Sequence, residues 1–127
     1  MDDGLERADL VAVYGTLREG GGNHVTMTHA SGGKLLGKFW TTPDWTMYTL
    51  GGYPALTEGG SDSVLLEIYR VKSLKALDQL EGYPGYYDRK VIETPWGGAW
   101  LYIMDEDAIP LNTYPVDSGD WIKYRSN

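Results

Sequence analysis

A carboxylate beside the expected end of a helix is the residue of this chain best suited to acid/base chemistry. Glu81 precedes Gly82 and Pro84, a pattern typical of a helix terminus. The unpaired carbonyls of a last helical turn disfavour a further negative charge by about 0.3–1 kcal/mol, and Asp78, one turn earlier, adds repulsion. Both effects predict a raised pKa for Glu81, as a general acid/base near neutral pH requires. The alternative interpretation is a solvated surface carboxylate.

A second candidate is a loop near the N-terminus, Tyr14-Gly15-Thr16-Leu17-Arg18. A glycine directly after an apolar run allows successive backbone N–H groups to turn out of a sheet and point at one spot. Such a nest binds carboxylates or phosphates without a basic side chain. The spacing of a phosphate-binding P-loop is absent, which favours a carboxylate. An ordinary strand-to-loop turn is the alternative.

The turn after the expected helix holds three tyrosines and an arginine. If Tyr83 and Tyr87 wall a pocket, they exclude water and strengthen each charge interaction inside it. Arg89 would then orient a substrate carboxylate or a neighbouring side chain. In the alternative interpretation the tyrosines pack the turn, and Arg89 pairs with Asp88 or Glu93.

Other common catalytic arrangements are absent from the sequence. His24 and His29 are five positions apart, a spacing that does not share one helical face, so no metal site is predicted. The chain has no cysteine, which excludes disulfides, thiolate zinc sites and a cysteine nucleophile. No G-x-S-x-G turn is present, and neither histidine has an evident aspartate partner for a serine triad.

Length and charge narrow the class of protein. A chain of 127 residues suits one domain, 1–127, with the acidic stretch 1–8 as a flexible leader. The net charge of −7 and the scattered lysines and arginines argue against nucleic acid as a partner. No apolar run is long enough to span a membrane, and no signal peptide is recognisable. Together with the absence of cysteine, these features favour the cytoplasm.

The elements expected to position these residues are mostly strands. Ten tyrosines, five tryptophans and seventeen glycines favour strands and turns. Leucines at helical spacing predict one helix over 74–81 with Ser73 as its N-cap, and Asn23 could cap a short helix over 24–30. Strands are expected at 9–14, 34–42, 45–50, 64–71, 86–94 and 99–104. The sequence therefore predicts a β-rich α+β fold.

Four segments, taken in order, strongly resemble the γ-glutamylcyclotransferase-like family, and most closely its AIG2-like, γ-glutamylamine cyclotransferase branch. They are Tyr14–Arg18, Gly51–Leu56, Leu77–Pro84 with Tyr87 and Arg89, and Ser118–Trp121. The resemblance covers nearly the whole chain. It implies a small mixed-strand β-barrel with a few short helices and a cavity at one side.

The resemblance also implies the site and the reaction. A γ-glutamyl cyclotransferase acts on a γ-glutamylamine or γ-glutamyl amino acid: the substrate's own α-amine attacks the γ-carbonyl, which gives 5-oxoproline and a free amine without cofactor or metal. The residues that match are Glu81 as the catalytic acid/base, Tyr14, Gly15, Thr16 and Leu17 as the loop that binds the glutamyl moiety, and Tyr53 and Tyr87 as lining residues.

Two further functions would use the same fold. The first is a catalytically silent binding or regulatory module, although the acid at position 81 is retained. The second is biosynthetic removal of a protecting γ-glutamyl group from a larger metabolite. Gly20, Gly21 and Gly22 also depart from the family pattern and predict a loose loop after the Tyr14–Arg18 segment.

Overall fold

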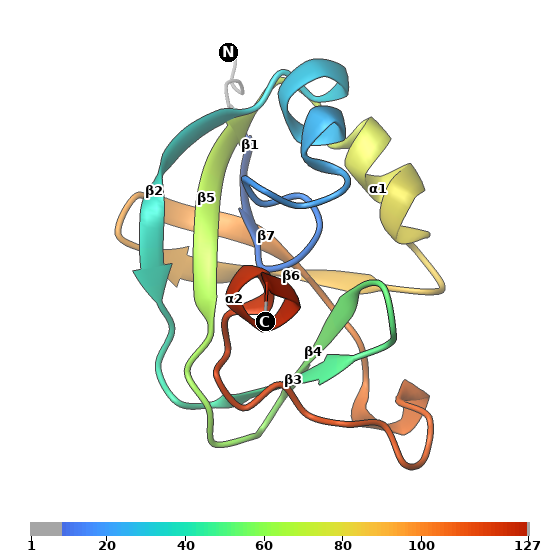
Figure 1. Ribbon diagram of the computed structural model, residues 1–127. Coiled ribbons are helices and arrows are strands. Elements are labelled where there is room, and N and C mark those ends of the chain that lie inside the picture. Colours follow the sequence, from blue (N-terminus) through green and yellow to red (C-terminus); the bar gives the residue numbers. More distant parts are fainter. Residues whose placement is uncertain (1–8, 127) are drawn as a thin grey trace.

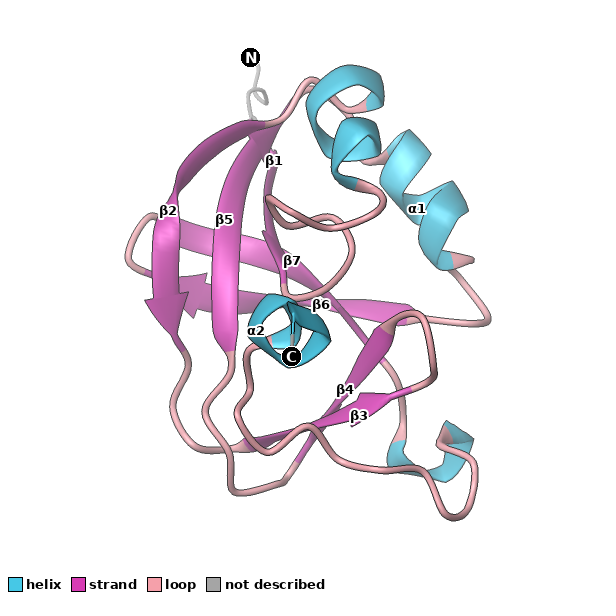
Figure 2. Ribbon diagram, viewed as in Figure 1, coloured by secondary structure: helices cyan, strands magenta, loops and turns pink. Residues whose placement is uncertain are grey.

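The computed structural model describes residues 9–126, so the leader expected at 1–8 lies outside the described residues. The strands form two sheets. The first two helical segments lie together at one side, whereas the C-terminal helix appears end-on near the middle of the view (Figures 1 and 2). The five-stranded sheet has the order β2-β5-β1-β7-β6, and the second sheet pairs β3 with β4. The strands are β1 Asp9–Val13, β2 Lys34–Trp40, β3 Trp45–Thr49, β4 Pro54–Glu58, β5 Leu65–Val71, β6 Asp88–Thr94 and β7 Gly97–Ile103. The helical segments are the π-helical turn Thr26–Ala30, α1 Lys75–Glu81, the 3-10 turn Glu106–Ala108 and α2 Trp121–Ser126.

The central strand of the larger sheet is β1, which leads directly into the Tyr14–Arg18 loop. It pairs antiparallel with β5 and parallel with β7, so the sheet is mixed, as predicted. Val11 and Ala12 are fully buried. A loop that leaves a strand held on both edges starts from a fixed point, which is what a binding loop requires.

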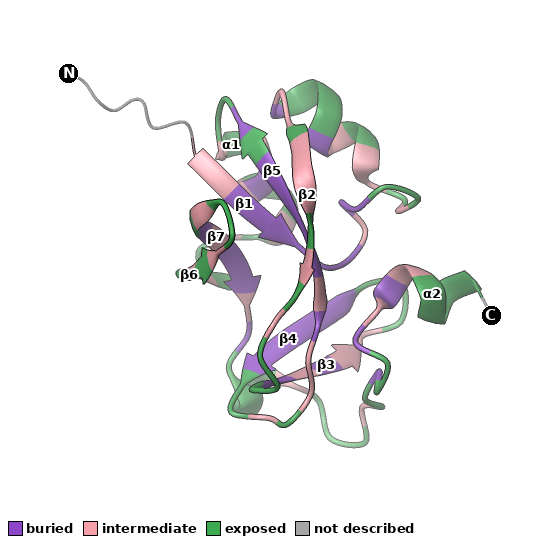
Figure 3. Ribbon diagram, turned by 90° about the vertical axis from the view of Figure 1, so that its left-hand side faces the viewer, coloured by how far each residue is buried: buried purple, intermediate pink, exposed green. Residues whose placement is uncertain are grey.

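The strands expected from the sequence do not include residues 54–58, where β4 lies. Pro54 is the first residue of the strand, a position where a missing N–H is tolerated. Residues 54–57 are buried (Figure 3). Met104 N–H, just after β7, donates to Leu56 O over 2.9 Å and joins the two sheets.

The predicted class, α+β with mostly mixed strands, is confirmed. The strand ladders of residues 9–126 form two separate sheets rather than one closed ring, and the Met104–Leu56 hydrogen bond joins them. Trp121, at the start of α2, is 2% exposed and packs with Met47 and Leu101 in the core. The segment after residue 105 thereby contributes to the core.

Helix α1 ends as predicted, at Glu81, and Gly82 takes the left-handed conformation with φ 68°. Its start differs by one residue, because Leu74 is the N-cap, although Ser73 Oγ still accepts the Lys75 N–H. The π-helical turn near residue 28 lies beside α1 (Figure 1). Asn23 does not cap that turn, because its side chain donates to Thr16 Oγ1 instead.

A buried ion cluster fixes the far end of the Tyr14–Arg18 loop. Arg18 Nε donates to Glu67 Oε2 on β5, and Arg18 Nη1 donates to Asp120 Oδ1 before α2, each over 2.9 Å. Glu67 is fully buried and also accepts hydrogen bonds from the Glu19 N–H and the Tyr69 hydroxyl. The buried carboxylate of β5 is thus fully engaged, and the cluster ties the loop to both β5 and the C-terminal segment.

Arg18→Met is expected to lower the free energy of unfolding by about 3–5 kcal/mol, because it leaves a buried carboxylate without its partner. Urea denaturation at pH 7 measures this loss. The control is Lys90→Met, which breaks the exposed Lys90–Glu58 pair and should change stability by less than about 1 kcal/mol. Similar small losses in both variants would contradict a structural role for Arg18.

Candidate active site

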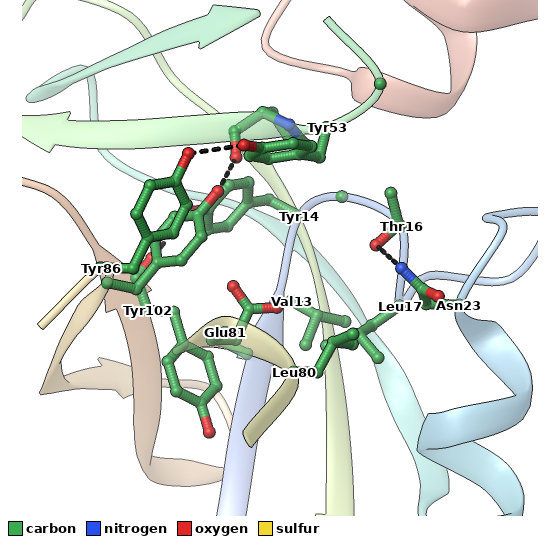
Figure 4. A pocket seen from close by; sticks show the side chains of 15 residues that line it. Val13, Tyr14, Thr16, Leu17, Asn23, Tyr53, Leu80, Glu81, Tyr86 and Tyr102 are labelled. Carbon is green, nitrogen blue, oxygen red and sulfur yellow. Dashed lines mark hydrogen bonds between the residues drawn. The ribbon is translucent and has the colours of Figure 1, made fainter. Parts of the chain in front are cut away.

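One cavity of about 360 Å³ brings together the site residues that the family resemblance implies, whereas Tyr83, considered as a wall of the pocket, does not line it (Figure 4). It opens where β1 ends, between the Tyr14–Arg18 loop and the end of α1. Its walls include the seven predicted positions, Tyr14, Gly15, Thr16, Leu17, Tyr53, Glu81 and Tyr87. These residues come from three segments far apart in sequence, so the fold places them in one site.

The loop contributes backbone groups to this cavity. Within the described part of the chain, no backbone hydrogen bond uses the N–H of Gly15, Thr16 or Leu17 as its donor, while the Arg18 N–H closes the turn onto Gly15 O over 3.0 Å. Free amides on a tight turn can bind an anion. Position 15 needs glycine, because a Cβ there would lie 2.7 Å from the Pro54 ring.

Two buried tyrosines hold the walls in place. The Tyr14 hydroxyl donates to Tyr102 O over 2.7 Å, and the Tyr87 hydroxyl donates to Pro54 O over 2.6 Å. Burial, reinforced by the nearby Glu81, raises the pKa of both phenols well above the ordinary value. They therefore stay neutral at physiological pH, and their hydroxyls are already engaged by backbone carbonyls.

Glu81 is the acidic group of the cavity, and its side chain lies between the tyrosines and the Thr16–Leu17 side of the site (Figure 4). Among residues 9–126, no hydrogen-bond donor or cation is paired with its carboxylate. Burial raises the pKa of Glu81 from 4.5 to about 7. A carboxyl group that titrates near neutrality can both accept and donate a proton.

The predicted direction of the Glu81 shift is confirmed, but its cause is different. Repulsion from Asp78 was expected to contribute, whereas burial alone accounts for the shift in pKa. The charge of Asp78 is neutralised, because Arg89 Nη1 donates to both of its carboxylate oxygens over 2.7 and 2.8 Å. Loop amides also engage the last carbonyls of α1: the N–H groups of Gly82 and Tyr83 donate to Gln79 O and Asp78 O.

Of the roles considered from the sequence, Arg89 takes that of orienting a neighbouring side chain, because its guanidinium pairs with Asp78. Among the described residues, the guanidinium neither lines the cavity nor pairs with the carboxylates of Asp88 and Glu93. Its guanidinium lies between the Tyr83 and Trp100 rings, 4.3 and 4.5 Å from their centroids. Cation–π contacts of this kind stabilise a desolvated arginine. Arg89 therefore fastens the end of α1, which carries Glu81, to the sheet.

The sequence interpretation missed several lining residues. Asn23, Leu80, Tyr86 and Tyr102 also face the cavity. Asn23 was assigned to a helix cap, and Tyr86 belonged to the tyrosine-rich turn without a separate role. Tyr102 gave no local signal, because its place depends on the parallel pairing of β7 with β1.

The two histidines considered in the sequence analysis lie in different surroundings. His24 Nδ1 hydrogen-bonds to Leu17 O over 2.9 Å, while His29 is exposed. Within residues 9–126, no three His, Cys, Asp or Glu side chains are grouped to hold a metal ion. No helix in that part of the chain is long and apolar enough to cross a membrane.

Comparison with known proteins gives consistent matches. The family model described as gamma-glutamyl cyclotransferase, AIG2-like, matches residues 11–123. A Vibrio cholerae protein described as "Putative gamma-glutamylcyclotransferase" is 48% identical over 114 residues, which cover 88% of this chain and 94% of that protein. The solution structure of protein YtfP from Escherichia coli is 32% identical with a TM-score of 0.67, and the match covers 91% of this chain and 98% of YtfP. A mouse AIG2-like crystal structure is 26% identical, with a TM-score of 0.68 and 76% of each chain covered.

Glu81→Gln is expected to change how stability depends on pH. The folded pKa of Glu81, about 7, lies above the unfolded value of 4.5, so the native protein loses stability as pH rises between these values. At 1.36 kcal/mol per pH unit, the loss is at most about 3 kcal/mol. The amide does not titrate, so the variant should be the more stable protein at pH 8, and the two should converge near pH 4.5.

Urea denaturation between pH 4.5 and 8 tests this expectation, with Glu93→Gln as the control because Glu93 is an exposed carboxylate on β6. Parallel stability curves for the wild type and Glu81→Gln would contradict a buried, ionisable Glu81.

Arg89→Met is expected to destabilise the protein by about 1–3 kcal/mol, because Asp78 loses its partner in a partly buried site. The unpaired Asp78 charge, one turn from Glu81, should also raise the pKa of Glu81 further. The double variant Asp78→Asn/Arg89→Met carries neither charge, so its Glu81 pKa should return toward the wild-type value. Carbon-13 NMR titration of the Glu81 carboxyl measures all three proteins, and identical titrations would refute the electrostatic role of the pair.

Proposed function

Because this chain belongs to the gamma-glutamyl cyclotransferase, AIG2-like family, we propose that it converts a γ-glutamyl amide into 5-oxoproline and a free amine. The observation that carries the proposal is the position of Glu81, a carboxyl group with a pKa of about 7 in a cavity that also presents three free loop amides. This arrangement combines a proton-transfer group with an anion-binding loop in one small site.

The substrate supplies its own nucleophile. The α-amine attacks the γ-carbonyl carbon, a C–N bond closes the five-membered ring, and the C–N bond to the leaving amine breaks. Intramolecular reactions of well-oriented groups reach effective molarities of about 10⁵–10⁸ M, so the protein has to hold the substrate in a folded conformation. A rigid cavity with tethered tyrosines suits that task.

Glu81 moves the protons in this scheme. Its carboxylate takes a proton from the substrate α-ammonium, which frees the amine for attack, and its acid form returns that proton to the departing nitrogen. The attacking nitrogen loses a second proton as the lactam forms, and the released amine takes up this proton and leaves as an ammonium ion. A group with a pKa near ambient pH performs both halves efficiently. No proton is gained or lost overall by the protein in one cycle.

The loop is assigned to the substrate's α-carboxylate. The N–H groups of Gly15, Thr16 and Leu17 would donate to it, a charge-assisted contact that needs no basic side chain. Tyr14, Tyr53 and Tyr87 would line the glutamyl chain. This use of backbone donors explains how a protein of net charge −7 could bind an acidic metabolite.

Glu81→Gln is expected to lower 5-oxoproline formation from a γ-glutamyl amide at least about a hundredfold, because general acid/base catalysis contributes about 10²–10⁴. The wild-type kcat/KM should rise with pH through about 7, because the free protein must carry Glu81 as the carboxylate. Chromatographic measurement of 5-oxoproline across pH tests both points.

Glu93→Gln, at an exposed position, serves as the control and should retain wild-type turnover. Undiminished turnover in folded Glu81→Gln would rule out this assignment of the acid/base.

A further inference from the structure

A second hollow adjoins the candidate active site and shares two of its walls. Tyr53 and Tyr86 line both spaces, and the second, a groove of about 640 Å³, is otherwise formed by residues 49–51, Gly85 and the segment 104–114. The Tyr53 and Tyr86 hydroxyls meet over 2.5 Å at the boundary (Figure 4). The groove therefore begins where the active-site cavity ends.

Three aromatic rings lead from the site of reaction to this groove. Tyr87, in the cavity with Glu81, contacts Tyr86 edge to face at 5.3 Å between centroids, and Tyr86 contacts Tyr53 in the same way at 6.3 Å. Tyr86 and Tyr53 are 53% and 37% exposed. Large, partly exposed aromatic side chains beside a catalytic cavity are well suited to contact a substrate.

The groove is uncharged. Its lining is made of aliphatic, aromatic, hydroxyl, amide and glycine residues, such as Leu50, Met104, Pro110 and Tyr114. Charge is found only on neighbouring segments. Asp105, Glu106 and Asp107 precede the lining residue Ala108, and Glu106 already accepts hydrogen bonds from the Tyr48 and Thr57 hydroxyls. On another side, Arg125 donates to Gly51 O over 3.3 Å.

We propose that this groove binds the leaving half of the substrate, and that the preferred substrates are γ-glutamyl amides whose amide nitrogen carries an uncharged aromatic or long aliphatic substituent. This inference rests on the proposed function. With the glutamyl half held by the loop and Glu81, the amide nitrogen points out of the cavity, and the shared tyrosines direct its substituent into the groove. Burial of apolar surface there favours such amines.

A leaving amino acid fits this groove poorly. Its carboxylate would lose water without gaining a cation from the lining, and the acidic 105–107 segment would repel it. The structure thus distinguishes two closely related leaving groups, phenethylamine and phenylalanine, which differ only in that carboxylate.

Three substrates test the proposal on the wild-type protein: γ-glutamylmethylamide, γ-glutamylphenethylamide and γ-glutamylphenylalanine. The kcat/KM for the phenethylamide is expected to exceed each of the other two by at least about tenfold. Turnover of the methylamide without this preference, or a preference for γ-glutamylphenylalanine, would overturn the groove assignment. Failure of all three to release 5-oxoproline would instead overturn the proposed function.

A matched pair of variants locates the effect in the groove. Ala108 and Ala30 are both exposed and both end a short helical turn, but only Ala108 lines the groove. Ala108→Trp should fill the groove and lower kcat/KM for the phenethylamide about tenfold, with methylamide turnover unchanged. Ala30→Trp should change neither. An unaltered preference in Ala108→Trp, with methylamide turnover showing that the protein is folded, would overturn the proposal.

Discussion

The withdrawal of the Glu81 carboxyl from water without a countercharge is the constraint on which the site depends. A buried carboxylate is normally paired, and pairing lowers its pKa. Here no hydrogen-bond donor or cation of the described residues meets it, so burial alone moves the pKa to about 7. Any cation brought near would remove the property that suits this group to proton transfer, so the surrounding structure has to keep other charges engaged elsewhere.

Two ion clusters meet this requirement. Arg18 directly follows the cavity-lining residues of the loop, but its charge is paired with the carboxylates of Glu67 and Asp120. Arg89 forms an ion pair with Asp78, one turn from Glu81, and cation–π contacts with two aromatic rings. Each cluster also ties one wall of the cavity to the sheet. The same contacts therefore set both the geometry and the local field of the site.

Local sequence patterns predicted much of this molecule, and long-range pairing accounts for what they missed. Apolar runs and helical leucine spacing located most strands and α1, and Gly82 marked the helix end. The partner of Arg89 could not be predicted, because Asp78 is eleven positions away on α1, whereas Arg89 lies on β6. Strand β4 was missed because proline usually interrupts a strand. Here Pro54 is the first residue of β4, and the strand is held by its pairing with β3. The cavity residues were predicted through the family resemblance, whereas Tyr102 faces the cavity because of a parallel strand pairing.

The presence of one carboxyl group among the described residues that line the cavity suits the proposed reaction. An external nucleophile would need its own activating base, whereas a substrate amine held near its own carbonyl needs only orientation and one proton carrier. The tyrosine hydroxyls are consistent with this division of roles, because those of Tyr14 and Tyr87 are bound to backbone carbonyls and hold the walls rather than exchange protons. Orientation then falls to the loop amides and the walls, and proton transfer to Glu81. The removal of the Glu81 carboxyl from water has two effects. It raises the pKa toward neutrality, which suits proton transfer, and it lowers the stability of the folded protein when the group is ionised.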